Sequence, residues 1–136
     1  MVSKKISGTG KMQAEDNMER TCPIHKTMDF IGKRWTLMIL LELYRGKAKW
    51  KRYSEVKRGL KGITPKILSM RMKELVKEGL VRKKVDARTF PVKSEYSLTD
   101  RGEDFVKIIK EIKAWGLKWK VRNEVCQSVE CQQCEF

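Results

Sequence analysis

The stretch from Ile63 to Leu98 constrains the fold most, because an amphipathic helix runs directly into a basic β-hairpin there. Thr64 is a suitable N-cap, since its hydroxyl can accept from the amides of the first turn, and Pro65 fits the first helical position. Gly79 ends the helix. Apolar residues recur at steps of three and four, which predicts one buried face. They are Ile67, Leu68, Met72, Leu75 and Val76.

The opposite face of this helix is polar and basic. It carries Lys66, Ser69, Met70, Lys73 and Lys77. Two strands are predicted next, Leu80 to Val85 and Val92 to Leu98, with the loop Asp86 to Pro91 between them. Alternation on the second strand predicts that Tyr96 and Leu98 are buried and that Glu95 and Ser97 are exposed.

A second short helix is predicted just before, from Tyr53 to Arg58, followed by the turn Gly59 to Gly62. Two helices joined by a tight glycine-containing turn, the second one basic, form a helix-turn-helix, and the hairpin then forms a wing. The basic residues of the wing are Arg82, Lys83, Lys84, Arg88 and Lys93.

Three further helices are predicted around this unit. Pro23 to Ile31 forms the first, and Gly32 breaks it. Trp35 to Tyr44 is apolar nearly all round, as expected of a central helix, and Gly46 follows its end. Thr99 caps a long helix from Asp100 to Arg122. The predicted fold is therefore mostly α (α+β), a winged helix-turn-helix with a two-stranded wing and helices at both ends.

The charge distribution indicates a polyanionic partner. The chain has 136 residues and a net charge of +14, and the segment from Arg45 to Lys93 holds 17 lysines and arginines but only four acids, a net charge of +13. Such a patch favours a phosphate backbone or an anionic membrane surface. No apolar run approaches a membrane span and no signal core follows the N-terminal lysines. We therefore expect a soluble, cytoplasmic protein with no membrane partner.

A series of motifs, in order, resembles the HxlR family of winged helix-turn-helix transcriptional regulators, from Cys22 to about Trp119. They are Cys22-Pro23, Ile31-Gly32-Lys33-Arg34-Trp35-Thr36-Leu37, Gly62-Ile63-Thr64-Pro65-Lys66-Ile67-Leu68-Ser69-Met70-Arg71-Met72-Lys73-Glu74-Leu75, Glu78-Gly79-Leu80-Val81, Glu95-Tyr96-Ser97-Leu98-Thr99 with Gly102, and Trp115-Gly116. The chain departs from the family pattern at Ser94 and in the basic stretch Lys49 to Tyr53.

The resemblance implies a homodimer, paired through its first and last helices, that binds pseudo-palindromic operators in double-stranded DNA and regulates transcription. Residues 1–20 are polar, rich in Gly, Ser and Lys and without a period, which predicts a flexible basic arm. The resemblance then implies an HxlR-type winged helix-turn-helix domain (21–122), followed by a cysteine-containing tail (123–136). On the last helix an apolar stripe is expected at the dimer interface. Its members are Ile108, Ile112, Trp115 and Trp119.

In this motif the N-terminal turns of the basic helix point into the major groove. We expect base-edge contacts from Lys66, Ser69, Met70 and Lys73. The first turn, at Thr64 and Pro65, is expected on a phosphate. In the wing, Arg88 and Lys93 are expected at the minor groove or its phosphates. A helix face that is only exposed to solvent would explain any single lysine equally well. It would not explain a net charge of +13 within one stretch of the chain.

Other polar and aromatic residues point to structure rather than catalysis. Arg71 is expected to pair with Glu74 or Glu78. His25, the only histidine, has no partner at a catalytic spacing, so we do not expect an enzyme. Trp50 lies in a basic loop and the sequence does not place it.

The cysteines could add chemistry. Cys126, Cys131 and Cys134 follow the spacing C-x4-C-x2-C, which resembles three ligands of a plant-type [2Fe–2S] site. The family resemblance implies that the N-terminal region lies near the last helix in the dimer, so that Cys22 could supply a fourth ligand. An iron–sulfur cluster, zinc or a thiol switch are the chemical possibilities. The rival expectation, and the one we favour, is a disordered tail whose thiols do little.

Two other function classes share these features. A nonspecific architectural nucleic-acid-binding protein would have the same charge patch without discriminating between sequences. A redox or iron–sulfur carrier would need a complete cofactor site, which three tail cysteines do not form. The sequence identifies neither the operator nor an inducer.

Overall fold

The computed structural model describes residues 21–134, and the chain is divided into two units, the first ending at Arg34 and the second beginning at Trp35. In the first unit, helix α2 spans Pro23–Ile31, as predicted, with proline in its first turn. Its end is closed by the amide of Gly32, which donates to the carbonyl oxygen of Met28 at 3.0 Å. The predicted basic arm, 1–20, lies outside the described residues.

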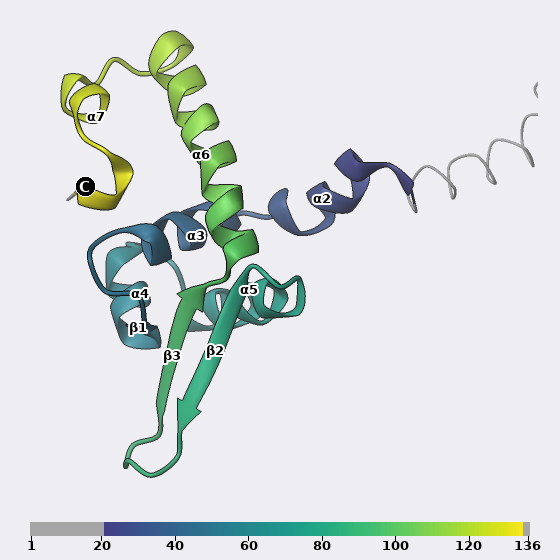
Figure 1. Ribbon diagram of the computed structural model, residues 1–136, viewed down its shortest axis with the longest axis vertical. Coiled ribbons are helices and arrows are strands. Elements are labelled where there is room, and N and C mark those ends of the chain that lie inside the picture. Colours follow the sequence, from purple (N-terminus) through teal and green to yellow (C-terminus); the bar gives the residue numbers. More distant parts are fainter. Residues whose placement is uncertain (1–20, 135–136) are drawn as a thin grey trace, which may run out of the picture. The chain divides into compact units, whose positions relative to one another are not determined.

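The second unit contains the helix-turn-helix, the wing and the C-terminal segment (Figure 1). It is mostly helical with a small antiparallel sheet, which confirms the predicted winged-helix fold class. Its elements in order are α3 (Thr36–Tyr44), β1 (Lys51–Arg52), α4 (Tyr53–Gly59), α5 (Pro65–Lys77), β2 (Val81–Asp86), β3 (Lys93–Leu98), α6 (Asp100–Trp119), α7 (Glu124–Ser128) and the 3-10 helix η1 (Cys131–Gln133).

The helix boundaries agree with the sequence prediction to within about one turn. Helix α3 begins at Thr36 rather than Trp35, because Trp35 adopts a left-handed conformation with φ 81°. Helix α6 begins after the predicted cap, where the Thr99 hydroxyl accepts from the amide of Gly102 at 3.1 Å. It ends at Trp119, one turn earlier than predicted.

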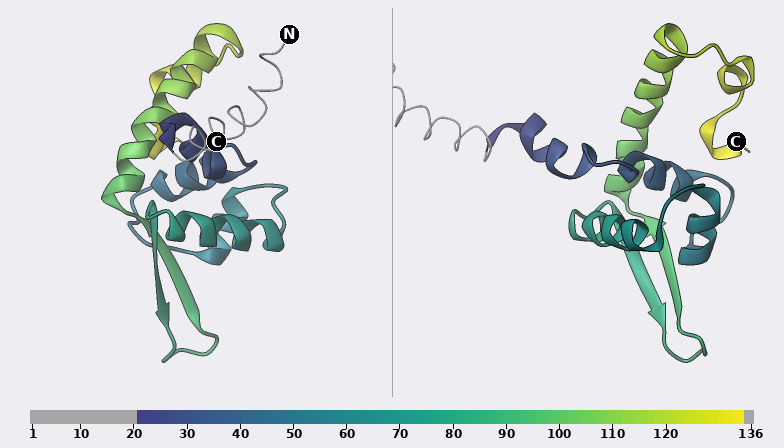
Figure 2. Two further views of the ribbon diagram at one scale, coloured as in Figure 1. Left: turned by 90° about the vertical axis from the view of Figure 1, so that its right-hand side faces the viewer. Right: turned by 180° about the vertical axis from the view of Figure 1, so that it is seen from behind.

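The sheet has three strands in the order β1-β3-β2, all antiparallel. Strands β2 and β3 form the predicted wing, each starting one residue later than expected, and this hairpin extends away from the helices of its unit (Figure 2). Strand β1 was not predicted. Its two residues pair with β3, Lys51 opposite Tyr96 and Arg52 opposite Glu95, so the basic stretch before α4 is part of the sheet.

The predicted exposure of Ser97 is wrong. Tyr96, Ser97 and Leu98 are all buried. Neighbouring residues on a strand point to opposite faces, so the base of β3 is covered on both sides. Helices α3, α4 and α6 all contact β3, which accounts for this burial.

The core of this unit lies between α3, α4, α5 and α6. Of the predicted buried stripe on α5, Leu68, Met72 and Leu75 are buried, whereas Ile67 is half-buried and Val76 is exposed. Residues from the other helices complete the core. They include Ile39 and Leu40 of α3, Val56 of α4, and Val106 and Ile109 of α6.

The expectation of a disordered tail is wrong for residues 123–134. Asn123 caps α7 by accepting from the amide of Cys126 at 3.0 Å, and Glu130 caps η1 by accepting from the amide of Gln132 at 2.7 Å. These caps belong to very short helices, so contacts with the rest of the unit must hold the segment in place.

The C-terminal segment, residues 123–134, packs against α6 and the end of α3. The amide of Gly46 donates to the carbonyl oxygen of Gln132 at 2.7 Å. On the α6 side, Lys113 donates to the carbonyl oxygen of Val129 at 3.0 Å, and Lys110 forms an ion pair with Glu130. The segment therefore connects two helices that lie far apart in the sequence.

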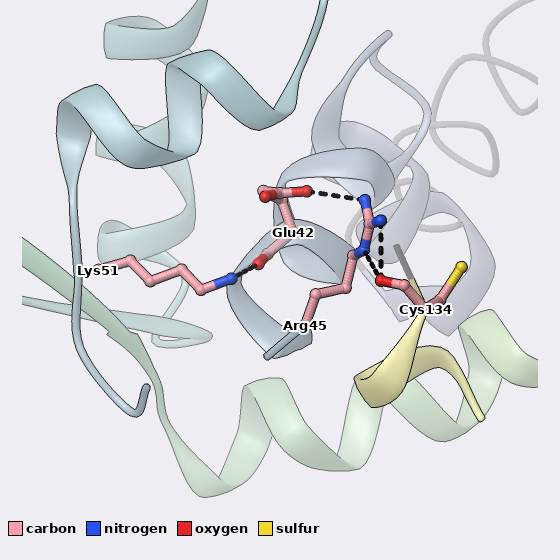
Figure 3. Close-up of polar contacts among 4 residues, drawn as sticks. All are labelled: Glu42, Arg45, Lys51 and Cys134. Atoms are coloured by element: carbon pink, nitrogen blue, oxygen red, sulfur yellow. Dashed lines mark hydrogen bonds and ion pairs between the residues drawn. The ribbon is translucent and has the colours of Figure 1, made fainter. Parts of the chain in front are cut away.

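Figure 3 shows the attachment at the end of α3. Arg45 donates to the main-chain carbonyl of Cys134 and also to the carboxylate of Glu42, at 3.1 Å. On the other side, Lys51 of β1 donates to the main-chain carbonyl of Glu42. Burial lowers the pKa of Lys51, against the opposing effect of the Glu42 charge. The end of α3 thus contacts both the C-terminal segment and the sheet.

Candidate nucleic-acid interface

Helix α5 is positioned by local signals at both ends. The Thr64 side chain accepts from the amide of Ile67 at 3.2 Å, and Pro65 occupies the first turn without losing a hydrogen bond. Past the other end, Gly79 has φ +81°, a left-handed conformation that favours glycine. These signals lie next to each other in the chain, which explains why the sequence predicted the helix well.

The structure brings the four predicted base-contacting residues onto one face of α5. Lys66, Met70 and Lys73 are exposed, and Ser69 between them is half-buried. The first turn of the helix, capped by Thr64 and begun by Pro65, lies at the same end. A helix with this arrangement can present two ammonium groups, a thioether and a hydroxyl to the edges of base pairs.

Tyr53, for which the sequence carries no binding signal, connects α4 to this face. Its hydroxyl lies 2.9 Å from the carbonyl oxygen of Pro65 and 3.1 Å from the hydroxyl oxygen of Ser69. Tyr53 is the first residue of α4, so this side chain links the two helices of the helix-turn-helix at their N-terminal ends.

A groove of about 560 Å³ separates α5 from the wing. The ammonium groups along it come from both sides: Lys73 and Lys77 from α5, and Lys83 from β2. Apolar side chains cover its floor, including the buried Met72 and Tyr96. Three lysines of the central segment therefore line one groove, and their charge favours a phosphate backbone there.

The basic residues of the wing divide between its two faces. Residues directly opposite each other in an antiparallel pair share a face. Lys83, opposite Tyr96, faces the groove. Lys84 lies opposite Glu95, with which it forms an ion pair at 3.4 Å, on the other face. The two lysines are neighbours in the sequence, and the register of the hairpin decides which of them faces the groove beside α5.

The two predicted wing contacts lie near the tip. Lys93 is opposite Asp86 at the end of the hairpin. Arg88 donates from its amide and its Nε to the carboxylate of Asp86, at 3.0 and 3.2 Å, while its side chain stays exposed. These hydrogen bonds from Arg88 lower the pKa of Asp86. The structure does not bring Arg88 and Lys93 together with the contacts on α5.

Trp50 lies against the wing. The Lys84 ammonium is 4.3 Å from the centre of its ring, and the Arg82 guanidinium 5.6 Å. This cation–π stacking holds two basic residues of β2 in place. Arg71 pairs with Glu74 at 3.2 Å, as expected, rather than facing the interface.

Three basic or aromatic residues of this surface were missed or undervalued from sequence: Tyr53, Lys77 and Lys83. The helical period placed Lys77 on the basic face, but nothing local shows that the wing lies beside it. For Lys83 the alternation along β2 carried a usable signal, since it shares its face with Val81 and Val85.

The expected dimer residues form an exposed apolar stripe on α6. Trp115 is 59% exposed and Trp119 66%, and Ile108 and Ile112 are about half exposed. All four fall at helical spacing along one side of α6.

The three tail cysteines do not gather into a metal site. Between residues 21 and 134 there is no group of three or more His, Cys, Asp or Glu side chains that could hold a metal ion. Cys22, Cys126, Cys131 and Cys134 are all free thiols, and Cys131, within the C-terminal segment, is buried. Among the described residues of the tail, the side chains are therefore not arranged as ligands of one iron–sulfur cluster or zinc ion.

None of the helices that the structure describes is long and apolar enough to cross a membrane.

Known proteins share this architecture. Residues 30–124 match the family model of the HxlR-like helix-turn-helix. The chain is 38% identical over 104 residues to the HTH-type transcriptional regulator YvaP of Bacillus subtilis (strain 168), covering 76% of this chain and 93% of YvaP.

Among solved structures, one described as a MarR-family transcriptional regulator from Porphyromonas gingivalis W83 superimposes with a TM-score of 0.65 and 37% identity, over 73% of this chain and 93% of that one. The reduced form of the regulator YodB from B. subtilis gives a TM-score of 0.62 and 28% identity, over 76% and 99%. YodB has also been solved after diamide treatment. The chain belongs to the HxlR-like helix-turn-helix family and is a DNA-binding transcriptional regulator with a winged helix-turn-helix domain.

Proposed function

We propose that this regulator binds a specific pseudo-palindromic operator as a homodimer, with α5 in the major groove and the wing beside it. The observation that carries the proposal is the exposed face of α5, where Lys66, Ser69, Met70 and Lys73 lie together next to the lysine-lined groove. Lysine can donate to guanine, serine can contact several base edges, and methionine can pack on a thymine methyl group.

Affinity and specificity come from different parts of this surface. Lys77 and Lys83 along the groove, with Arg88 and Lys93 near the tip of the wing, would neutralise phosphates and release condensed counterions. This contribution does not depend on sequence. Discrimination between sequences must come from the side chains that reach base edges, which on this surface are those of α5.

A second copy of the chain would cover the apolar stripe on α6. Four large apolar side chains exposed at helical spacing form a surface suited to a partner helix. A symmetric dimer would place two α5 helices on one side of the duplex, about 34–36 Å or a multiple of this apart, which requires an inverted repeat. The partners proposed are thus double-stranded DNA and a second copy, in the cytoplasm, with no catalytic role.

Selection from a random duplex library, followed by sequencing of the bound DNA, tests the proposal. The expected result is an inverted repeat that wild-type protein binds at least about a thousandfold more tightly than random duplex at the same salt concentration. Lys66→Ala should weaken binding to this repeat more than to random duplex. Lys107→Ala, on the exposed surface of α6, is the matched control and should bind like wild type.

Equal binding to every duplex would support a nonspecific architectural protein and refute the operator. Equal losses for Lys66→Ala on both kinds of DNA would place Lys66 on a phosphate instead of a base.

A further inference from the structure

We propose that Tyr53 fixes the hydroxyl of Ser69 as a hydrogen-bond acceptor, so that α5 selects an adenine or a cytosine at the base that Ser69 meets. This inference rests on the proposed function, because it requires the exposed face of α5 to lie in the major groove. It adds which base edges that face can take at one position.

The first step is the direction of the hydrogen bonds. The Tyr53 hydroxyl lies within hydrogen-bonding distance of two oxygens, the carbonyl of Pro65 at 2.9 Å and the hydroxyl of Ser69 at 3.1 Å. A carbonyl oxygen can only accept, and a phenol has one proton to give. Either hydroxyl could be the donor in the contact between Tyr53 and Ser69 taken alone. Both contacts are hydrogen bonds at once only if Tyr53 donates to Pro65 and Ser69 donates its own proton to Tyr53.

The second step is what remains available on Ser69. A serine hydroxyl has one proton and two acceptor lone pairs. With the proton directed at Tyr53, the side chain offers a ligand only its lone pairs. Ser69 is half-buried, lies between the exposed Lys66 and Lys73 on α5, and lines the groove together with Lys73.

The third step is the chemistry of the major groove. Adenine presents the N6 amino donor and cytosine the N4 amino donor, whereas guanine O6 and N7 and thymine O4 are acceptors. A freely rotating serine can serve both classes, which is why its contacts usually carry little information. A serine that can only accept binds the amino groups and leaves a guanine or thymine oxygen without a partner.

Tyr53 is therefore a positioning residue that acts through Ser69. The hydrogen bond between Ser69 and Tyr53 should persist when DNA is bound, because Tyr53 begins α4 and its other hydrogen bond is to the first turn of α5. Turning the Ser69 proton toward a base would break its hydrogen bond to Tyr53.

The test starts from the inverted repeat selected with the wild-type protein. Each adenine in a half-site is replaced by purine, which lacks the N6 amino group, and each cytosine by 2-pyrimidinone, which lacks the N4 amino group. Wild type is expected to lose about fivefold to tenfold in affinity at one position from the loss of one hydrogen bond. Ser69→Ala should show no loss at that position, since the partner is already absent.

Tyr53→Phe is expected to keep binding but to lose the preference. Its Ser69 hydroxyl can turn and donate, so adenine or cytosine at this position should be favoured less than twofold over guanine or thymine. Tyr44→Phe is the matched control, because the Tyr44 hydroxyl contacts Lys110 and Glu130 and lies outside the interface. It should retain the wild-type preference.

Three outcomes overturn the inference while leaving the proposed function intact. One is a selected operator in which no amino group is sensitive to Ser69→Ala. Another is a Tyr53→Phe protein with the wild-type preference. The third outcome needs no variant of Tyr53. The wild-type protein would tolerate deletion of the amino group but lose affinity when N7 of a guanine at the base that Ser69 meets is replaced by carbon. A library without any enriched sequence would instead refute the proposed function, and this inference with it.

Discussion

Arg45 donates two hydrogen bonds to the carbonyl oxygen of Cys134, from Nε at 3.1 Å and from Nη2 at 2.9 Å. The two residues are 89 positions apart, and the contact joins the end of α3 to the last described residue of the chain. A charged donor makes each of these hydrogen bonds stronger than a neutral one. The C-terminal segment is thus attached to the same unit that carries α5 and the wing.

Arg45→Met should release this attachment. Hydrogen bonds to charged groups contribute about 1.5–3 kcal/mol, so amide exchange at Gly46 and Gln133 should be about tenfold faster or more. Exchange measured by NMR checks this. Lys47→Met, at an exposed lysine two residues away, should leave both amides as protected as in wild type. Unchanged protection in Arg45→Met would mean that other contacts hold the segment.

Acid should also loosen the C-terminal segment. The hydrogen bond from Lys110 lowers the pKa of Glu130 below its ordinary value of 4.5, and the same pair raises the pKa of Lys110. A lowered carboxyl pKa stabilises the folded segment above pH 4.5, and this contribution is lost as the pH falls through the lower folded value. The effect is small, because both side chains are about 40% exposed.

Backbone NMR relaxation of residues 129–134 between pH 6 and pH 3 measures this effect. In the wild-type protein the motion of residues 129–134 should increase toward pH 3. In Glu130→Gln the motion of this segment should be the same at every pH between 6 and 3. A wild-type segment that keeps its order at pH 3 would exclude Glu130 as the group responsible.

Trp115→Glu should prevent dimerisation. A carboxylate in the centre of the apolar stripe on α6 would have to be buried without a partner in a dimer. We expect a monomer by light scattering and a loss of operator binding. Lys107→Glu places the same charge on α6 outside the stripe and should remain dimeric. Wild-type protein that is monomeric at micromolar concentration would refute the dimer.

Arg88→Ala should weaken binding to all duplexes alike. Loss of one phosphate contact should reduce the slope of log K against log salt by roughly one unit. Asp86→Asn serves as a comparison, because it removes the acid that Arg88 contacts while keeping the arginine. Titrations at several salt concentrations measure both slopes. An unchanged slope for Arg88→Ala would remove this residue from the interface.

Thiol oxidation should change operator affinity if the cysteines act as a switch. Diamide takes two hydrogens from a pair of thiols and leaves a disulfide, and a disulfide that fits one conformation better than another shifts their populations. We expect a difference of about 1 kcal/mol or more, roughly fivefold, between reduced and diamide-treated protein.

Two variants separate the possible sites. Replacement of Cys126, Cys131 and Cys134 by serine tests the C-terminal segment, and Cys22→Ser tests the N-terminal thiol. The variant that abolishes the response shows whether the C-terminal cysteines or Cys22 are required for it. Equal affinity of the wild-type protein in both states would leave all four cysteines without a regulatory role.

The sequence by itself determined the elements whose signals are local. Thr64 and Pro65 start α5, and Gly79 follows its end, because a cap, a fixed φ and a left-handed turn each act within one helical turn. The family motifs then predicted the winged helix-turn-helix, and the position of the basic residues predicted a nucleic-acid surface.

Tertiary structure decided the features that depend on distant neighbours. Lys51 and Arg52 have no strand signal of their own and form β1 only because β3 offers an open edge beside them. The tail is ordered because Arg45 and Gly46 provide partners for its carbonyl groups. These contacts join residues far apart in the chain, and no local pattern encodes them.

The same distinction applies within the interface. The helical period placed Ser69 on the exposed face of α5, but it could not say which way its hydroxyl points. That direction depends on Tyr53, 16 residues earlier in the chain, whose hydroxyl reaches Ser69 only when α4 and α5 are packed together. Periodicity sets which side of a helix a residue occupies, whereas the direction of a single proton is set by the partner that the fold brings within hydrogen-bonding distance.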